Sequence, residues 1–98
     1  MSNHDKLNLQ SKISHAEEVF WQDVVGDIVI LDMEQGQYFG AEDTGARIWK
    51  LIEQPITVAH LCDQLLALYE IDRKTCETEV LAYLEQLLAA KLIVISSA

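Results

Sequence analysis

The sequence has few basic residues: seven Lys and Arg stand against sixteen Asp and Glu, which gives a formal net charge of −9. A protein that binds nucleic acid neutralises the phosphates with a surplus of Lys and Arg on one face. The shortage of basic side chains therefore argues against a nucleic-acid partner. An acidic surface also favours encounter with basic or neutral partners, and it keeps a small protein soluble.

The sequence also lacks a long apolar run and an export leader. No stretch of about 18 consecutive apolar residues is present, and the N-terminus has no charged segment followed by an apolar one. We therefore expect no membrane span and a cytoplasmic location. With 98 residues, of which 50% are hydrophobic, the chain is expected to form one domain around a single modest core.

Cysteine, histidine and glycine are too few or too scattered to form a recognisable chemical site. Cys62 and Cys76 have no second pair of Cys or His at metal-ligand spacing, and we expect buried, reduced thiols. Of the three histidines, only His60 lies in a predicted helix, and it has no ligand partner nearby. No glycine-rich run precedes a helix to hold a phosphate. We therefore expect no catalytic residue, no metal and no cofactor, and we expect that the chain is not an enzyme.

The first half of the chain has the pattern of short strands. Residues 1–16 are polar with scattered apolar residues, so we expect a flexible N-terminal arm there and a single domain at 17–98. After the arm, β-branched and aromatic residues cluster between turn residues at Gly26-Asp27 and Glu34-Gln35-Gly36. This spacing predicts a meander. Its three strands are expected near residues 18–24, 28–33 and 37–40.

The second half changes to the spacing of helices. Three segments carry apolar residues at steps of three and four, and Pro55 follows the first of them as a stop signal. Asp43 or Thr44 can cap the first helix, Thr57 the second and Asp72 the third. The predicted helices are DTGARIWKLIE (43–53), VAHLCDQLLALY (58–69) and TCETEVLAYLEQLLAA (75–90).

Strands followed by helices indicate an α+β domain, in which three helices cover one face of a three-stranded antiparallel sheet. The apolar tail at 92–96 is expected either to add a strand or to pack on the helices. This shape is winged-helix-like, but shape alone does not establish function. The helix that would read DNA carries Glu77, Glu79 and Glu85 and no Lys or Arg. A winged-helix transcription regulator or a dimerisation module is therefore only the alternative.

Two features of the predicted fold indicate a peptide-binding groove. The strand at 37–40 is short and is expected at the edge of the sheet, where its N–H and C=O groups are unpaired. The helix at 75–90 has an apolar face of roughly 160°, wider than the stripe of about 100° that packs on one core. An extended peptide could pair with the edge and lie against the helix. The alternatives are that the tail covers this flank, or that the edge pairs with a second copy in a homodimer.

Short motifs along the chain follow one another in a fairly specific order. They are Leu31, Asp32, Gly36 and Tyr38 around the second turn, Gly45, Ile48 and Trp49 in the first helix, Thr57 and Val58 at the second, and Glu79, Val80, Tyr83, Leu84 and Leu87 in the third. In this order and spacing, the sequence resembles the PqqD-like family, the small domains known as RiPP recognition elements. The resemblance covers about residues 19–95.

The resemblance implies a non-catalytic, winged-helix-like domain. Such domains bind the leader segment of a ribosomally made precursor peptide and deliver it to a modifying enzyme or a leader peptidase. In the family, the leader pairs with the third strand and lies against the third helix. The residues at the matching positions are Gln37, Tyr38, Phe39, Gly40, Cys76, Glu79, Val80, Tyr83 and Leu87.

Three positions depart from the family's usual pattern. Ala41-Glu42 stands where Leu-Asn is frequent, Glu79 where Asp is frequent, and Lys91 where Gly often ends the third helix. The change at Lys91 argues against the pyrroloquinoline quinone branch. The resemblance therefore favours the free-standing members that serve lasso peptide pathways, ahead of other radical-enzyme or quinone pathways.

Overall fold

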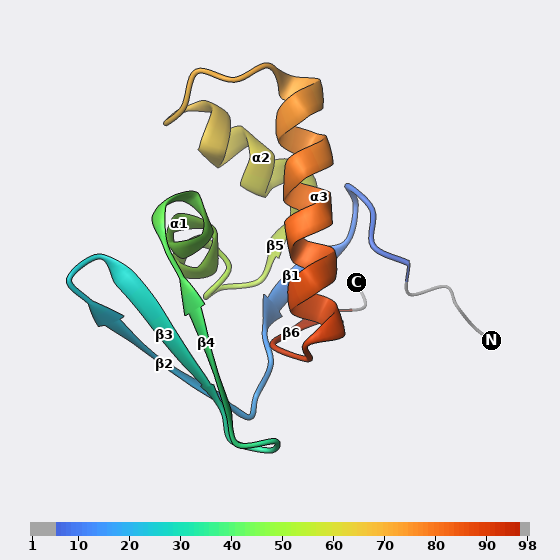
Figure 1. Ribbon diagram of the computed structural model, residues 1–98. Helices are drawn as coiled ribbons and strands as arrows, with labels where there is room; N and C mark the ends of the chain where they lie inside the picture. Colours follow the sequence, from blue (N-terminus) through green and yellow to red (C-terminus); the bar gives the residue numbers. More distant parts are fainter. Residues whose placement is uncertain (1–5, 97–98) are drawn as a thin grey trace.

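The computed structural model describes residues 6–96, which form two small antiparallel sheets and three helices (Figure 1). One sheet has the strand order β2-β3-β4 and the other the order β5-β1-β6. The α+β class is thereby confirmed, together with the predicted three-stranded sheet. The elements in chain order are β1 (Lys12–His15), β2 (Val19–Val24), β3 (Asp27–Asp32), β4 (Gln37–Ala41), α1 (Asp43–Leu51), β5 (Ile56–Thr57), α2 (Val58–Leu66), α3 (Arg73–Ala89) and β6 (Ile93–Ser96).

The turn between β3 and β4 is built around Asp32, whose side chain is almost completely buried. Its Oδ1 accepts hydrogen bonds from the backbone N–H groups of Glu34, at 3.0 Å, and Gln35, at 3.3 Å. The N–H of Gly36 donates to the carbonyl of Asp32 at 2.7 Å, and Gly36 has a φ of 68°, which favours glycine. Asp32 and Gly36 thus fix where β4 begins.

The sheet β2-β3-β4 has one buried face and one exposed face, as the period of two along a strand requires. Ile28 and Ile30 of β3 are buried, whereas Val29 between them is 40% exposed. The register places Ala41 opposite Ile28 and Phe39 opposite Ile30, so these two residues of β4 share the buried face. This face packs toward α1.

The second sheet, β5-β1-β6, was not predicted. Its central strand β1 pairs with both β5 and β6, and Ile13 of β1 is completely buried. Leu7 also belongs to the core. The described part of the N-terminal segment, residues 6–16, is therefore part of the fold, which differs from the flexible arm expected over 1–16. Residues 1–5 lie outside the described residues.

The apolar tail forms β6, so the first of its two expected placements is the one observed. β6 pairs antiparallel with β1, from Lys12 opposite Ser96 to His15 opposite Ile93. In Figure 1 the two strands lie at the lower part of α3. The tail thus completes a sheet of its own and does not pair with β4.

His15, at the end of β1, connects the two sheets through aromatic contacts. Its ring stacks on Trp49 of α1, with 3.8 Å between the ring centroids, and meets the edge of Trp21 of β2 at 5.9 Å. Its Nε2 lies 2.8 Å from the carbonyl oxygen of Trp49. Burial lowers the pKa of His15, which favours the neutral ring. Because a carbonyl only accepts, Nε2 carries the proton of that neutral ring.

The caps predicted for the second and third helices are confirmed. The hydroxyl of Thr57 accepts a hydrogen bond from the N–H of His60 at 3.1 Å, at the start of α2. The carboxylate of Asp72 accepts from the N–H of Thr75, also at 3.1 Å, at the start of α3. Each cap satisfies a backbone donor that the helix itself leaves unpaired.

The start of α1 differs from the expectation. Its N-cap is Glu42, whose side chain makes no capping hydrogen bond, so the prediction of Asp43 or Thr44 as the cap was wrong. The reason is the short connection: β4 ends at residue 41 and the helix begins at residue 43. Asp43 turns the chain there with a positive φ of 52°.

Cys62 of α2 and Cys76 of α3 are buried free thiols, as predicted. Burial raises the pKa of Cys62 to about 12, and the neighbouring Cys76 adds to this shift. Cys62 is therefore a neutral thiol at physiological pH and contributes to packing between the two helices.

Lys91, which lies just after α3, has a strained backbone conformation that can be tested by substitution. Lys91 follows the helix with a φ of 64°, and the N–H groups of Lys91 and Leu92 each donate at 3.0 Å to carbonyls of the last turn. A side chain in this left-handed conformation costs about 1 kcal/mol, and glycine avoids the cost. Lys91→Gly is therefore expected to raise the free energy of unfolding in urea by about 1 kcal/mol. Lys91→Ala keeps a Cβ atom, so an equal gain for Lys91→Ala would contradict this explanation.

Candidate functional site

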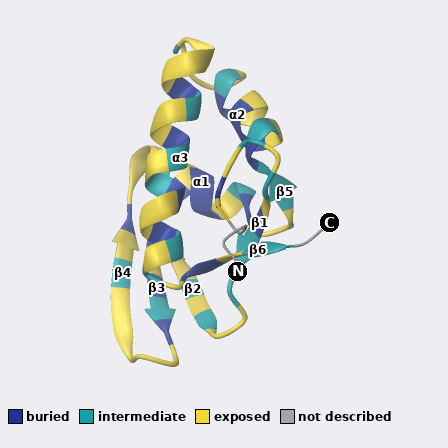
Figure 2. Ribbon diagram, turned by 90° about the vertical axis from the view of Figure 1, so that its right-hand side faces the viewer, coloured by how far each residue is buried: buried dark blue, intermediate teal, exposed yellow. Residues whose placement is uncertain are grey.

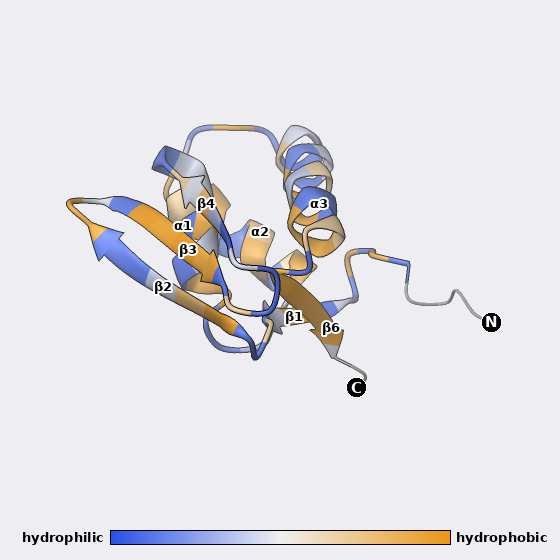
Figure 3. Ribbon diagram, turned by 60° about the horizontal axis from the view of Figure 1, so that its bottom comes forward, coloured by the Kyte–Doolittle hydropathy of each residue, from blue (hydrophilic) through white to orange (hydrophobic). Residues whose placement is uncertain are grey.

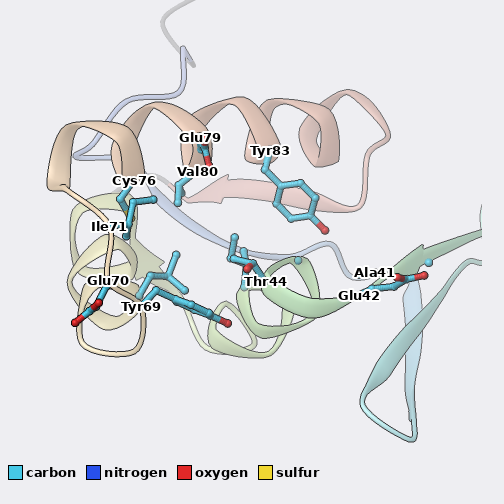
Figure 4. Close-up of a pocket in the computed structure, with 14 residues that line it drawn as sticks. Ala41, Glu42, Thr44, Tyr69, Glu70, Ile71, Cys76, Glu79, Val80 and Tyr83 are labelled. Carbon is cyan, nitrogen blue, oxygen red and sulfur yellow. The ribbon is translucent and has the colours of Figure 1, made fainter.

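A cleft with a volume of about 570 Å³ lies between the end of β4, α1, the connection from α2 to α3, and the first half of α3 (Figure 4). Its walls include the apolar side chains of Ile48, Leu65, Ile71 and Val80. Its size is in the range of ligand-binding pockets, which are concave and mostly apolar. The cleft is therefore a candidate binding site.

Five of the nine residues that the sequence associated with peptide binding line this cleft. They are Gly40 of β4 and Cys76, Glu79, Val80 and Tyr83 of α3. The structure thus brings the end of the expected edge strand together with the N-terminal half of the expected helix.

The other four residues do not line the cleft. Phe39 points to the buried face of its sheet, and Tyr38 points to the opposite face, where it is 73% exposed. Gln37 is exposed at the beginning of β4. Leu87 is buried in the core, because it lies on the side of α3 that packs against the rest of the domain.

The part of the cleft that comes from the connection between α2 and α3 was not predicted from the sequence. Tyr69, Glu70 and Ile71 of this connection line the cleft, as does Thr44 of α1. The periodicity of helices and strands does not predict which residues of a connection line a cleft. The position of this connection depends on how α2 and α3 pack. Ile71 is an apolar residue between two acidic ones, Glu70 and Asp72. This pattern is the signal in the sequence that could have indicated a buried contact from the connection.

The strand β4 is a free edge, as predicted. It pairs with β3 on one side, and no strand within residues 6–96 pairs with its other side. Figure 1 shows β4 as the strand of its sheet that lies on the side of α3, and Gly40 and Ala41 at its end line the cleft. Unpaired N–H and C=O groups therefore adjoin an apolar cavity.

The width of the cleft depends on a close approach between α1 and α3. A Cβ atom at Gly45 would lie 2.8 Å from Oη and 3.2 Å from Cζ of Tyr83, which is too close for the ring to keep its position. In Figure 4 the ring of Tyr83 extends from α3 toward α1. The ring is half-buried, and burial raises the pKa of Tyr83, so the phenol is protonated at physiological pH.

The charged groups of the cleft are all acidic. Glu42, Glu70 and Glu79 line it, and no Lys, Arg or His does. Such an environment favours apolar ligands with neutral or basic groups and disfavours phosphates and carboxylates.

Two other kinds of feature are absent from the described part of the chain. Among residues 6–96, no group of three or more His, Cys, Asp or Glu side chains is arranged to hold a metal ion. None of the helices in the same range is both long enough and apolar enough to cross a membrane.

The fold and the cleft define a small α+β binding domain, in which a strand with one unpaired edge lies beside an apolar cavity. The chain belongs to the PqqD family, because the family model described as coenzyme PQQ synthesis protein D matches residues 27–93. The matched range runs from the start of β3 to the start of β6. It therefore contains every element that lines the cleft.

Two solved structures are similar to this chain over most of its length. The structure of TbiB1 in complex with the TbiA(beta) leader peptide superposes with a TM-score of 0.79 at 29% identity, covering 82% of this chain and 93% of that one. A lasso peptide synthetase B1 complexed with the leader peptide superposes with a TM-score of 0.75 at 22% identity, covering 84% and 96%. No curated protein sequence matches the chain.

The contact between Gly45 and Tyr83 can be tested by a pair of substitutions. Alanine in a helix is about 1 kcal/mol more favourable than glycine, so Gly45→Ala should stabilise α1 wherever the methyl group fits. In the Tyr83→Ala background it is expected to raise the free energy of unfolding in urea by about 1 kcal/mol. With Tyr83 present, the overlap with the ring is expected to cancel that gain or reverse it. An identical effect in both backgrounds would show that the ring does not restrict this position.

Proposed function

We propose that this chain is a recognition element for the leader segment of a ribosomally made precursor peptide, in a pathway of the lasso peptide type. The observation that carries the proposal is the free edge of β4 beside the apolar cleft (Figure 4). The peptide adds a strand to β4 and places side chains in the cleft against α3. Peptide recognition by strand addition uses backbone hydrogen bonds for affinity and side-chain pockets for selectivity.

The similarity to TbiB1, which was solved with a bound leader peptide, supports this function. The likeness covers 82% of this chain and 93% of that chain at 29% identity. The lasso peptide synthetase B1, at 22% identity, supports the fold.

The surroundings of β4 suit the approach of a second backbone. Gly40 has no side chain, and a Cβ atom built there would meet no atom within 4 Å. A peptide strand beside Gly40 would point every second side chain toward the buried face, where the cleft opens. The volume of about 570 Å³ is large enough for apolar side chains of the peptide.

The roles proposed for the candidate residues follow from their positions. Residues 37–40 supply backbone hydrogen bonds to the peptide. Cys76, Val80 and Tyr83 supply contact surface in the cleft, and Glu79 supplies a negative charge at its wall. Leu87, which is buried, holds α3 in place from the core side.

We propose no catalytic role for the chain. It holds the peptide in the cytoplasm, where ribosomes make the precursor, and presents it to another enzyme of the pathway, such as a leader peptidase. Binding the leader in an extended conformation leaves the remainder of the precursor accessible to that enzyme.

The cleft can be tested by blocking it from an exposed position. Thr44 is exposed and lines the cleft from α1, so Thr44→Trp fills part of the space without replacing a core residue. A labelled synthetic leader, taken from the precursor encoded in the same gene cluster, should bind the variant at least about tenfold more weakly in fluorescence anisotropy. The matched control is Thr78→Trp, at an exposed position of α3 that does not line the cleft. Equal affinity for both variants, with native circular dichroism, would remove the cleft from the proposal.

Strand addition to β4 can be tested separately with backbone-modified peptides. In a β-ladder, the N–H groups of a strand point alternately toward and away from its neighbour. N-methylation along the leader should therefore weaken binding at every second position and have little effect between them. A uniform effect, or no effect at any position, would mean that the peptide does not pair with the edge.

A further inference from the structure

The two cysteines of the chain lie together where α2 packs against α3. Cys62 of α2 is completely buried, and Cys76 of α3 is 3% exposed. Their side chains are in hydrogen-bonding contact across the two helices. Cys76 also lines the cleft, whereas Cys62 does not. The pair of thiols therefore connects the wall of the cleft to the interior of the domain.

The position of Cys76 follows from the buried side of α3. Cys76, Val80 and Leu84 are spaced four residues apart, so they lie on one side of the helix, and all three are buried. Figure 2 shows buried residues alternating with exposed ones along α3, and Figure 3 shows hydrophobic and hydrophilic residues mixed along the same helix. Cys76 is the first buried residue of α3, at the point where this side of the helix meets both α2 and the cleft.

Ion pairs hold the two helices together beside the thiols. Arg73, at the start of α3, binds Asp63 of α2 at 2.6 Å and Glu77 of α3 at 2.8 Å. Asp63 follows Cys62 in the sequence, and Glu77 follows Cys76. The start of α3 is thereby tied to α2 next to the cysteines. This arrangement keeps the two sulfur atoms close to one another, as a disulfide requires.

The two thiols differ in how an oxidant reaches them. A small molecule that enters the cleft meets the sulfur of Cys76 first, because Cys62 lies behind it in the core. Hydrogen peroxide is small and uncharged, so the acidic side chains of the cleft do not repel it. Burial raises the pKa of Cys62 to about 12, so Cys62 keeps its proton while Cys76 reacts.

We propose that Cys62 and Cys76 form a redox-sensitive site, in which hydrogen peroxide converts the two thiols to a disulfide and thereby weakens leader binding in the cleft. This inference rests on the proposed function. The reduced protein binds the leader, and the oxidised protein releases it. A dithiol reductant reverses the change.

The reaction has two steps. The thiolate of Cys76 attacks one oxygen of the peroxide: an S–O bond forms, the O–O bond breaks, and the departing hydroxide takes up the proton lost by Cys76 to become water. The sulfur of Cys62 then attacks the sulfenic sulfur of Cys76: an S–S bond forms, the S–O bond breaks, and the departing hydroxide takes the proton of Cys62. The two thiols lose two electrons, and the peroxide gains them as it becomes two molecules of water.

The disulfide alters the wall of the cleft. Bonded sulfur atoms are about 2.05 Å apart, which is closer than two thiols in hydrogen-bonding contact. The bond therefore draws Cys76 toward α2 and shifts the turn of α3 that carries Glu79 and Val80, which line the cleft. A close-packed core transmits such a shift. Conversely, a leader bound in the cleft covers Cys76 and protects the pair from oxidation.

The test treats the wild type with hydrogen peroxide, removes the peroxide with catalase, and measures affinity for the labelled synthetic leader by fluorescence anisotropy. The affinity should fall at least about fivefold. Mass spectrometry of the wild type should show the loss of two hydrogen atoms and a peptide pair joined through Cys62 and Cys76. Dithiothreitol should restore the affinity. It does not reduce an oxidised Met33, which is exposed, so the recovery assigns the effect to the thiols.

The matched variant is Cys62→Ala, which removes the inner thiol and replaces no residue that lines the cleft. In the reduced state its leader affinity should stay within about twofold of the wild type, and the same peroxide treatment should change it by less than about twofold. Leader present at about ten times its dissociation constant should slow formation of the wild-type disulfide about tenfold.

The outcomes separate this inference from the function on which it rests. If the reduced wild type does not bind the leader, both are overturned. If it binds, but peroxide forms no disulfide or the disulfide leaves the affinity unchanged, the redox site is overturned and the proposed function stands. The redox site is also overturned if Cys62→Ala loses as much affinity as the wild type, because oxidation of Cys76 alone then explains the loss. The mass measurement on the wild type decides whether the disulfide forms even if Cys62→Ala does not fold.

Discussion

The pairing of β1 with β6 is the constraint on which the rest of the structure depends. Because β6 completes the sheet β5-β1-β6, it does not pair with β4, and the edge of β4 remains free. The same strand β1 ends at His15, whose ring stacks on Trp49 and holds α1 against both sheets. α1 in turn forms one wall of the cleft. A free edge and an adjoining cavity thus follow from a pairing at the other side of the domain.

The sequence was sufficient for features that depend on neighbouring residues. The meander, the three helices and the caps at Thr57 and Asp72 follow from local periodicity and turn chemistry. β1 was missed because it has only four residues in a polar segment, and its partners in β6 lie about eighty positions further along the chain. The contribution of Ile71 to the cleft was missed for a related reason: it depends on how α2 and α3 pack. The resemblance singled out Gly45, but the reason for a glycine appears only when Tyr83 is in place.

An open strand edge beside an apolar cleft is also a route to aggregation, and the charge of the chain counteracts it. Natural proteins protect such edges with charged residues or by covering them. Here the segment around the sheet carries only acidic charges, and the whole chain has a net charge of −9, so two copies repel one another as their edges approach. A ligand without that negative charge does not meet this barrier. The negative charge that limits pairing between two copies therefore does not oppose the binding of a neutral or basic peptide.

The two sheets differ in when they can form during synthesis on the ribosome. The strands of β2-β3-β4 lie within residues 19–41 and are joined by short turns, so this sheet can form while the rest of the chain is still being made. The sheet β5-β1-β6 requires residues 93–96. One side of β1 therefore stays unpaired until β6 has emerged from the exit tunnel. Until then, an ordered nascent chain has an open edge on β1 as well as on β4. Residues 93–96 therefore decide when the second side of β1 is covered.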